Sequence, residues 1–92
     1  MRNASLTLIN PLGLHARAAA KLVDVTKAFA SNVTLAKADK AVDAKSIMAV
    51  LMLGAPVGTE LELSVEGEDE DQAIEAIQAL VEAGFYELDD SG

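Results

Sequence analysis

The sequence predicts an α+β fold whose elements run in the order strand, helix, strand, strand, helix, strand, helix. Apolar and polar residues alternate strictly over residues 60–66, which is typical of a strand with one buried and one wet face. An apolar stripe at helical spacing follows at Ile74, Ile77 and Val81. We therefore expect an antiparallel sheet that is open on one side, with the last helix packed on its other side.

The earlier elements are indicated by short local signals. Pro11 and Gly13 interrupt the first apolar alternation, and good helix formers begin at Ala16. Apolar residues then recur at helical spacing as far as Phe29. The first three strands are predicted from alternating apolar and polar residues and from the turn residues that bound them. The marker positions are Leu6 and Leu8 for the first strand, Val33 and Leu35 for the second, and Val42 for a short third.

Residues 47–53 are all apolar and fit a buried strand as well as a short helix. Ser46 is a favoured N-cap and Gly54 a favoured C-terminal cap, so a two-turn helix is the better interpretation. Helical geometry places Val50 and Leu53 in the core. Two turns cannot bury every apolar side chain, and contiguous exposed apolar surface usually marks an interface. The candidates for exposure are Ile47, Met48 and Leu51.

The last helix is bounded by signals at both ends. Asp69 is the candidate N-cap, with Gln72 three residues on, and Gly84 is the expected terminator. The acidic run over residues 66–71 lacks the ligand spacing of an EF-hand. We therefore interpret its charge as complementing the dipole of this helix.

The single histidine lies in the run Gly13-Leu14-His15-Ala16-Arg17, where the first extended segment gives way to a helix. The N–H groups of a first helical turn lack intrahelical partners and, with the helix dipole, form an anion site. The guanidinium of Arg17 adds bidentate recognition of phosphate. This constellation can hold a phosphoryl group on imidazole. The motif alone leaves open the alternative of an ordinary capping histidine.

Charge is distributed unevenly along the chain, whose net charge is −8. Residues 1–45 hold all seven basic side chains and three acidic ones, a balance of +4, whereas residues 46–92 hold twelve acidic side chains and none that is basic. The net charge argues against a nucleic-acid partner. A basic region around His15 would steer it toward acidic partner proteins, although a charge mixture serving only solubility explains the pattern nearly as well. Its expected members are Arg17, Lys21, Lys27 and Lys45.

Length and composition narrow the function further. We expect one domain over residues 1–92, which is too small for a deep enclosed active site. A lone histidine without cysteine cannot build an ordinary zinc site, and no Gly-rich loop precedes Lys45 and Ser46, so we expect no cofactor or metal. The apolar run 47–53 is too short to span a bilayer, and no signal-type stretch follows the first five residues. These observations predict a cytoplasmic protein.

The His15 motif and the run Lys45-Ser46-Ile47-Met48 resemble the HPr family, the histidine-containing phosphocarriers of the bacterial phosphoenolpyruvate-dependent phosphotransferase system. The resemblance extends over about residues 5–86. It implies an open-faced βαββαβα sandwich, in which three helices cover one face of a four-stranded antiparallel sheet. It also implies that His15 accepts phosphate on Nδ1 from enzyme I and passes it to an enzyme IIA domain.

The resemblance implies roles for other residues too. Arg17 falls on the arginine that contacts the phosphate, and Ser46 on a serine that a dedicated ATP-dependent kinase modifies in many bacteria. We add the hypothesis that the amides of Ala16 and Arg17 bind phosphate oxygens. The partner-binding face would include Ile47, Met48 and Leu51, and we expect the carrier to be a monomer.

One position departs from the family pattern. Most members have proline after the arginine, whereas this chain has Ala18 at the start of an Ala-Ala-Ala run. Alanine keeps the helix intact, and the run resembles the nitrogen-related branch of the family, which serves regulation more than sugar uptake. Two further functions stay open: a regulatory module that acts by docking alone, and, less well supported, an independent phosphotransferase or phosphatase.

Overall fold

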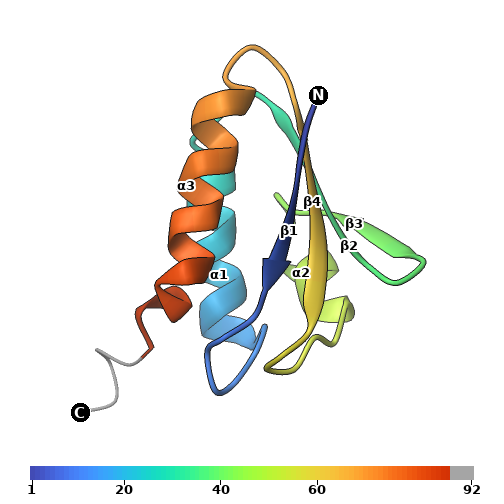
Figure 1. Cartoon of the computed structure of the whole chain (residues 1–92), viewed down its shortest axis with the longest axis vertical. Helices are drawn as coiled ribbons and strands as arrows, with labels where there is room; N and C mark the ends of the chain where they lie inside the picture. The colour runs from blue at the N-terminus through green and yellow to red at the C-terminus, as the bar shows by residue number, and fades with distance from the viewer. Residues whose placement is uncertain (88–92) are drawn as a thin grey trace.

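The computed structural model describes residues 1–87, and in this range it confirms the predicted order of elements (Figure 1). The four strands form one antiparallel sheet in the order β1-β4-β2-β3. The elements are β1 (Arg2–Thr7), α1 (Ala16–Thr26), β2 (Asn32–Lys37), β3 (Lys40–Asp43), α2 (Ile47–Met52), β4 (Glu60–Glu66), α3 (Glu70–Glu82) and a short 3-10 turn, η1 (Gly84–Tyr86).

The register of the sheet gives it one apolar and one polar face. Leu6 on β1 lies opposite Leu61 on β4, and Leu63 on β4 lies opposite Leu35 on β2. The residues between them, such as Glu62, point to the other face and are exposed. Because a one-residue slip would reverse both faces, this pattern fixes the register. Figure 1 shows α1 and α3 packed side by side on the apolar side of the sheet.

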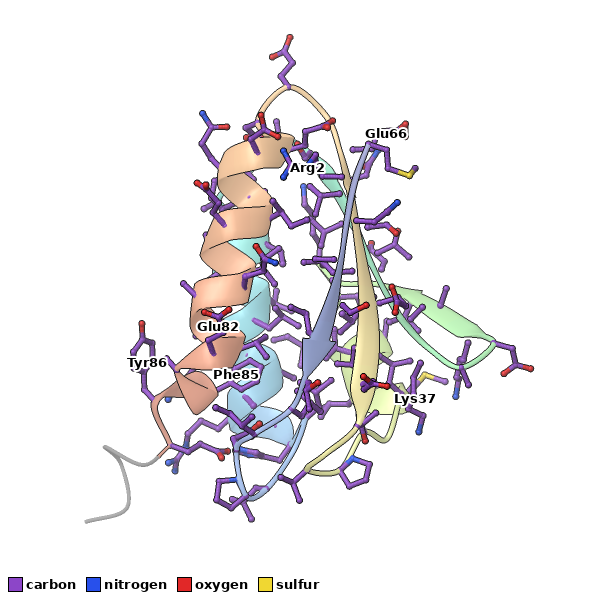
Figure 2. The ribbon with its side chains drawn as sticks, in the orientation of Figure 1. Arg2, Lys37, Glu66, Glu82, Phe85 and Tyr86 are labelled. Atoms are coloured by element: carbon purple, nitrogen blue, oxygen red, sulfur yellow. The ribbon has the colours of Figure 1, made fainter. Side chains whose placement is uncertain are left out.

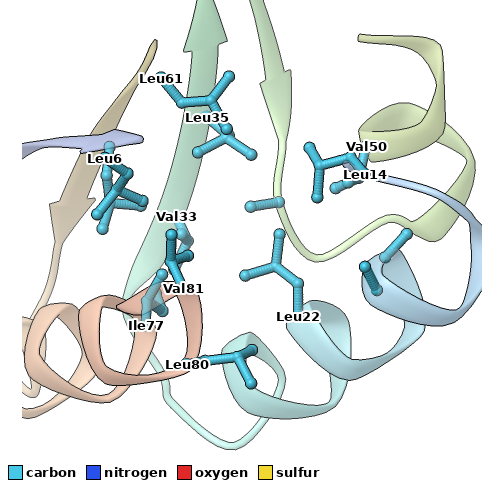
Figure 3. Close-up of a cluster of buried hydrophobic side chains, with 14 of the residues drawn as sticks. Leu6, Leu14, Leu22, Val33, Leu35, Val50, Leu61, Ile77, Leu80 and Val81 are labelled. Carbon is cyan, nitrogen blue, oxygen red and sulfur yellow. The ribbon is translucent and has the colours of Figure 1, made fainter. Parts of the chain in front are cut away.

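The core lies between this sheet and the helices (Figure 3). Each helix contributes fully or almost fully buried side chains, among them Leu22 from α1, Val50 from α2 and Ile77 from α3. The predicted extent of the first helix was wrong, because α1 ends at Thr26 and Phe29 is only partly buried in the turn beyond it. The Thr26 hydroxyl lies in the core, 2.8 Å from the carbonyl oxygen of Ala44, to which it donates.

The start of α3 differs from the predicted capping arrangement. Asp69 is the N-cap, but its side chain makes no capping hydrogen bond. Its carboxylate accepts instead from the Ser31 hydroxyl and from the backbone N–H groups of Ala30 and Ser31, at 2.8 and 2.9 Å. The Ser31 hydroxyl and then the Ala30 amide hold the pKa of Asp69 below its usual value, although partial desolvation opposes them. Asp69 therefore joins α3 to the α1–β2 connection.

Two loops at one end of the molecule are joined by backbone hydrogen bonds. The N–H of Leu14 donates to the carbonyl of Ala55 at 2.9 Å, and the N–H of Leu8 donates to that of Thr59 at 3.0 Å. Gly13 makes the close approach possible, because a Cβ there would lie within 2.8 Å of Pro56 Cα. We call the paired segments 8–15 and 53–59 the loop clamp. The clamp sets where α1 begins.

We predict that Gly13→Ala destabilises the protein more than Gly54→Ala. Both glycines have left-handed backbones, with φ of +64° and +58°, so both variants incur the roughly 1 to 2 kcal/mol cost of that conformation. At Gly54 the added methyl group meets nothing within 4 Å, whereas at Gly13 it overlaps Ala55 and Pro56. Urea unfolding of both variants measures the difference, and equal losses would contradict the tight approach within the loop clamp.

Candidate functional site

His15 is the N-cap of α1, at the junction of extended segment and helix where the sequence places it. Its backbone is extended, with φ −85° and ψ 179°, and its Nδ1 accepts a hydrogen bond from the N–H of Arg17 at 3.3 Å. A ring nitrogen that accepts a hydrogen bond carries its lone pair, so the proton of the neutral ring is assigned to Nε2. Nδ1 is therefore a free nucleophile at the positive end of the helix dipole.

The other ring nitrogen of His15 contacts Glu87, which the sequence motif gave no reason to expect. Nε2 pairs with Oε1 of a carboxylate that lies 72 residues along the chain. The Glu87 side chain is only 9% exposed, and that of His15 is 26% exposed. Burial opposes ionisation of Glu87, but hydrogen bonding to Asn10 and His15 and the amide of Leu12 together hold its pKa below the usual value.

The turn after α3 delivers Glu87 to the histidine. Gly84, Phe85 and Tyr86 have φ of 63°, 56° and 60°, which bends the chain toward the start of α1. Left-handed backbone costs about 1 to 2 kcal/mol for each non-glycine residue, so packing has to hold this turn in place. Phe85 is fully buried, and Lys21 Nζ donates to its carbonyl at 2.7 Å. Tyr86 instead points away from the molecule (Figure 2).

The predicted basic surroundings of His15 are only partly present. Arg17 and Ala16 are exposed in the first turn of α1, and within residues 1–87 the Arg17 guanidinium makes no hydrogen bond or ion pair. Lys27 and Lys45, by contrast, lie at the far end of α1, where Lys45 Nζ donates to the Phe29 carbonyl at 2.8 Å. At about 1.5 Å per residue, the length of α1 separates both from His15 by roughly 16 Å. Their prediction as neighbours was wrong.

Helix α2 has the caps that the sequence predicts. The hydroxyl of Ser46 accepts from the N–H of Ala49 at 3.2 Å, and Gly54 follows the C-cap in a left-handed conformation. Val50 and Leu53 are buried, also as predicted. The helix assignment for residues 47–53 is thus confirmed over Ile47–Met52.

The exposed side of α2 differs in one residue from the expectation. Ile47 and Met48 are 41% and 71% exposed, whereas Leu51 is half-buried and packs against the core. Met52, which the sequence analysis did not select, is 65% exposed. We call Ile47, Met48 and Met52 the α2 surface.

Two lysines from the β2–β3 hairpin reach the C-terminal end of α2. Lys40 Nζ donates to the carbonyl of Met52 at 2.9 Å, and Lys37 Nζ donates to that of Gly54 at 3.2 Å. Cations at the last carbonyls of a helix complement its dipole. They also place positive charge beside the α2 surface. Among the helices of residues 1–87, none has the length and apolarity needed to cross a membrane.

Comparisons with known proteins agree with this geometry. The family model for the PTS HPr component phosphorylation site matches residues 3–83. The phosphocarrier protein HPr of Xylella fastidiosa strain Temecula1 is 47% identical over 87 residues, covering 95% of this chain and 98% of the relative. The HPr of Pseudomonas aeruginosa is 49% identical over 83 residues, covering 89% and 92% of the two chains.

A comparison with solved structures also finds an HPr protein. The crystal structure of HPr-C-His from Thermoanaerobacter tengcongensis aligns with a TM-score of 0.90 at 41% identity, covering 92% of this chain and 96% of that one. The sheet and its three covering helices thus have counterparts in a solved phosphocarrier structure. The chain belongs to the HPr family.

The contact between His15 and Glu87 predicts a pH-dependent stability difference between the wild type and Glu87→Gln. A carboxylate whose pKa is lower in the folded state stabilises that state above its unfolded pKa of about 4.3, and this contribution disappears as the pH falls through the lowered value. We expect the variant to be less stable at pH 7 by about 1 kcal/mol, the difference between a charge-assisted and a neutral hydrogen bond.

Thermal melting between pH 7 and pH 2.5 measures this difference. The melting temperatures of the wild type and of Glu87→Gln should converge as the pH falls below about 4.3. A gap that stays constant over the whole range would show that the Glu87 charge does not contribute.

Proposed function

We propose that this chain is a stoichiometric phosphoryl carrier of the phosphotransferase system and not an enzyme with its own substrate. His15 accepts a phosphoryl group from enzyme I and passes it to an enzyme IIA domain. The observation that carries this proposal is that Nδ1 of His15 accepts the N–H of Arg17 at the positive end of α1. The Arg17 guanidinium lies two residues away and makes no hydrogen bond or ion pair within residues 1–87. Membership of the HPr family supports the same role.

The transfer step follows from positioning and electrostatics. The Nδ1 lone pair attacks phosphorus while the bond between phosphorus and the donor group of enzyme I breaks, and its electron pair stays on the donor. The Arg17 N–H that faced Nδ1 is then beside the phosphoryl oxygens. The free N–H of Ala16 and the Arg17 guanidinium bind the same oxygens. A helix end stabilises an anion by about 0.3 to 1 kcal/mol, which holds the group without preventing its release. Arg17 screens negative charge as donor and acceptor phosphates approach.

Docking to both partners uses the α2 surface beside the site. Ile47 and Met48 supply apolar contact area, and the half-buried Leu51 supports them from below. Lys37 and Lys40 at the end of α2 favour acidic partners. On this proposal the chain works as a monomer in the cytoplasm, without a cofactor or metal.

Ser46 lies where a modification would act on docking. A phosphate there adds a charge of about −1.5 to −2 at a helix start whose dipole tolerates it, so the fold is retained. The same charge would repel an acidic partner. It would also add a desolvation cost to any apolar contact made by Ile47 and Met48. We propose that an HPr kinase/phosphorylase phosphorylates Ser46 and thereby weakens docking to enzyme I. A regulatory module that only docks, with His15 as an ordinary cap, is the competing function.

Labelling by enzyme I separates the carrier from the docking module. We predict that His15→Ala remains folded but accepts no phosphate from enzyme I and phosphoenolpyruvate, because the chain has no other histidine. Lys27→Ala, which removes a charge at the far end of α1, should label like the wild type. The measurement is acid-labile, alkali-stable phosphate per chain. Labelling of His15→Ala at the wild-type level would refute the carrier role.

The regulatory role of Ser46 is tested by Ser46→Asp against Ser46→Asn. Both side chains cap a helix, but only aspartate brings the negative charge. We expect Ser46→Asp to weaken association with enzyme I roughly fivefold, about 1 kcal/mol, while Ser46→Asn binds like the wild type and both variants keep melting temperatures near it. Titration calorimetry at low salt measures the affinities. Equal binding of both variants would leave Ser46 as a helix cap alone.

A further inference from the structure

The contact between Glu87 and His15 has a chemical consequence for each half of the carrier cycle. Oε1 of Glu87 pairs with Nε2, whereas the proposed carrier function uses Nδ1. The carboxylate is mostly buried and lies at the end of a strained turn that Phe85 and Lys21 hold in place. The geometry therefore keeps an ionised acceptor against the ring.

The balance of the transfer step shows what this acceptor does. When Nδ1 bonds to phosphorus, the ring has bonds on both nitrogens and becomes cationic, and no proton has moved. When the phosphoryl group departs, the Nδ1–P bond breaks and its electron pair returns to Nδ1, so the ring leaves as neutral imidazole. If Nε2 had lost its proton in between, the leaving group would be an imidazolide anion, which is a far poorer one.

We propose that Glu87 is a positioning residue that keeps the proton on Nε2 of His15 throughout the cycle. This directs the incoming phosphoryl group to Nδ1 and keeps the phosphorylated ring in its cationic, transferable form. The inference rests on the proposed phosphoryl-carrier function and adds to it a residue outside the histidine motif. Glu87 does not touch the phosphoryl group and acts through the ring.

Within residues 1–87, few charged groups lie near this pair. On α1, Arg17 lies two residues from His15, and Lys21 Nζ is at the carbonyl of Phe85. The loop clamp contributes no Asp, Glu, Lys or Arg side chain. On α3, the nearest acidic residue in sequence is Glu82, which is exposed. Of Arg17, Lys21 and Glu87, only Glu87 is negatively charged, and its carboxylate is the group that contacts the ring.

The test uses chemical phosphorylation, so that it does not depend on enzyme I. Phosphoramidate transfers its phosphoryl group to an imidazole nitrogen and releases ammonia. In wild-type protein labelled with ¹⁵N, we expect the phosphoryl group on Nδ1, because Nε2 is covered by Glu87. Nuclear magnetic resonance of the ring nitrogens identifies the isomer and follows the loss of the Nε2 proton as the pH rises. Formation of the Nε2 isomer in the wild type would overturn the proposal without any variant.

The decisive comparison is between Glu87→Gln and Glu82→Gln. Both variants remove one negative charge, the first at the contact with the ring and the second at an exposed position on α3. In Glu87→Gln, the pH at which half of the phosphorylated rings have lost the Nε2 proton should fall by about one unit. Above both midpoints, loss of phosphate should then be about tenfold slower, because fewer rings are cationic. Glu82→Gln should match the wild type.

Equal midpoints in the wild type and Glu87→Gln would overturn the proposal, as would equal shifts in both variants, which would indicate only a long-range charge effect. Faster phosphate loss in Glu87→Gln would also overturn it, since it would mean that Glu87 merely shields the site. Glu87→Asp keeps the charge on a shorter side chain, so its midpoint should lie between those of Glu87→Gln and the wild type. If enzyme I fails to label the protein, the carrier function fails, while this result stands on its own.

Discussion

The loop clamp is the constraint on which the site depends. Its hydrogen bonds, Leu14 to Ala55 and Leu8 to Thr59, join the segment before α1 to the segment after α2. Gly13 allows the two backbones to approach, and the Asn10 side chain donates to the Gly13 carbonyl at 2.6 Å. The clamp therefore decides where the first N–H groups of α1 point. It also places the α2 surface at the same end of the molecule as His15.

Much of the fold was predictable from the sequence because its signals are local. Alternation over residues 60–66 and the caps at Ser46 and Gly54 each depend on a few neighbouring residues, and the structure confirms them. The N-cap position of His15 is local in the same sense. The signal failed where a tertiary contact replaced a local one. Asp69 is a residue type that favours helix caps, yet its carboxylate accepts hydrogen bonds from Ala30 and Ser31 in the connection between α1 and β2.

The part of the site that the sequence did not predict is non-local for the same reason. Glu87 lies 72 residues from His15, and no motif spacing relates them. Its placement depends on two consecutive non-glycine residues in left-handed conformations, which local propensity disfavours. A signal was present in the buried Phe85, because an aromatic side chain after a helix terminator is expected to pack and so to redirect the chain. Only the packed core decides that direction.

The arrangement of charge explains why so shallow a site serves a carrier. The acidic half of the sequence forms β4 and α3, and the outward side chains of β4, such as Glu60 and Glu62, lie on the open face of the sheet. The end of the molecule at which α1 starts has the clamp loops (Figure 1). These loops contain no Asp, Glu, Lys or Arg, and Arg17 and Lys21 follow them in the first part of α1. On the proposed function, the sheet face would repel an acidic partner, and the start of α1 would attract it. In the cycle proposed above, the Glu87 carboxylate would hold the ring proton without entering the path of the phosphoryl group, because it contacts Nε2 and leaves Nδ1 to the Arg17 side of the ring.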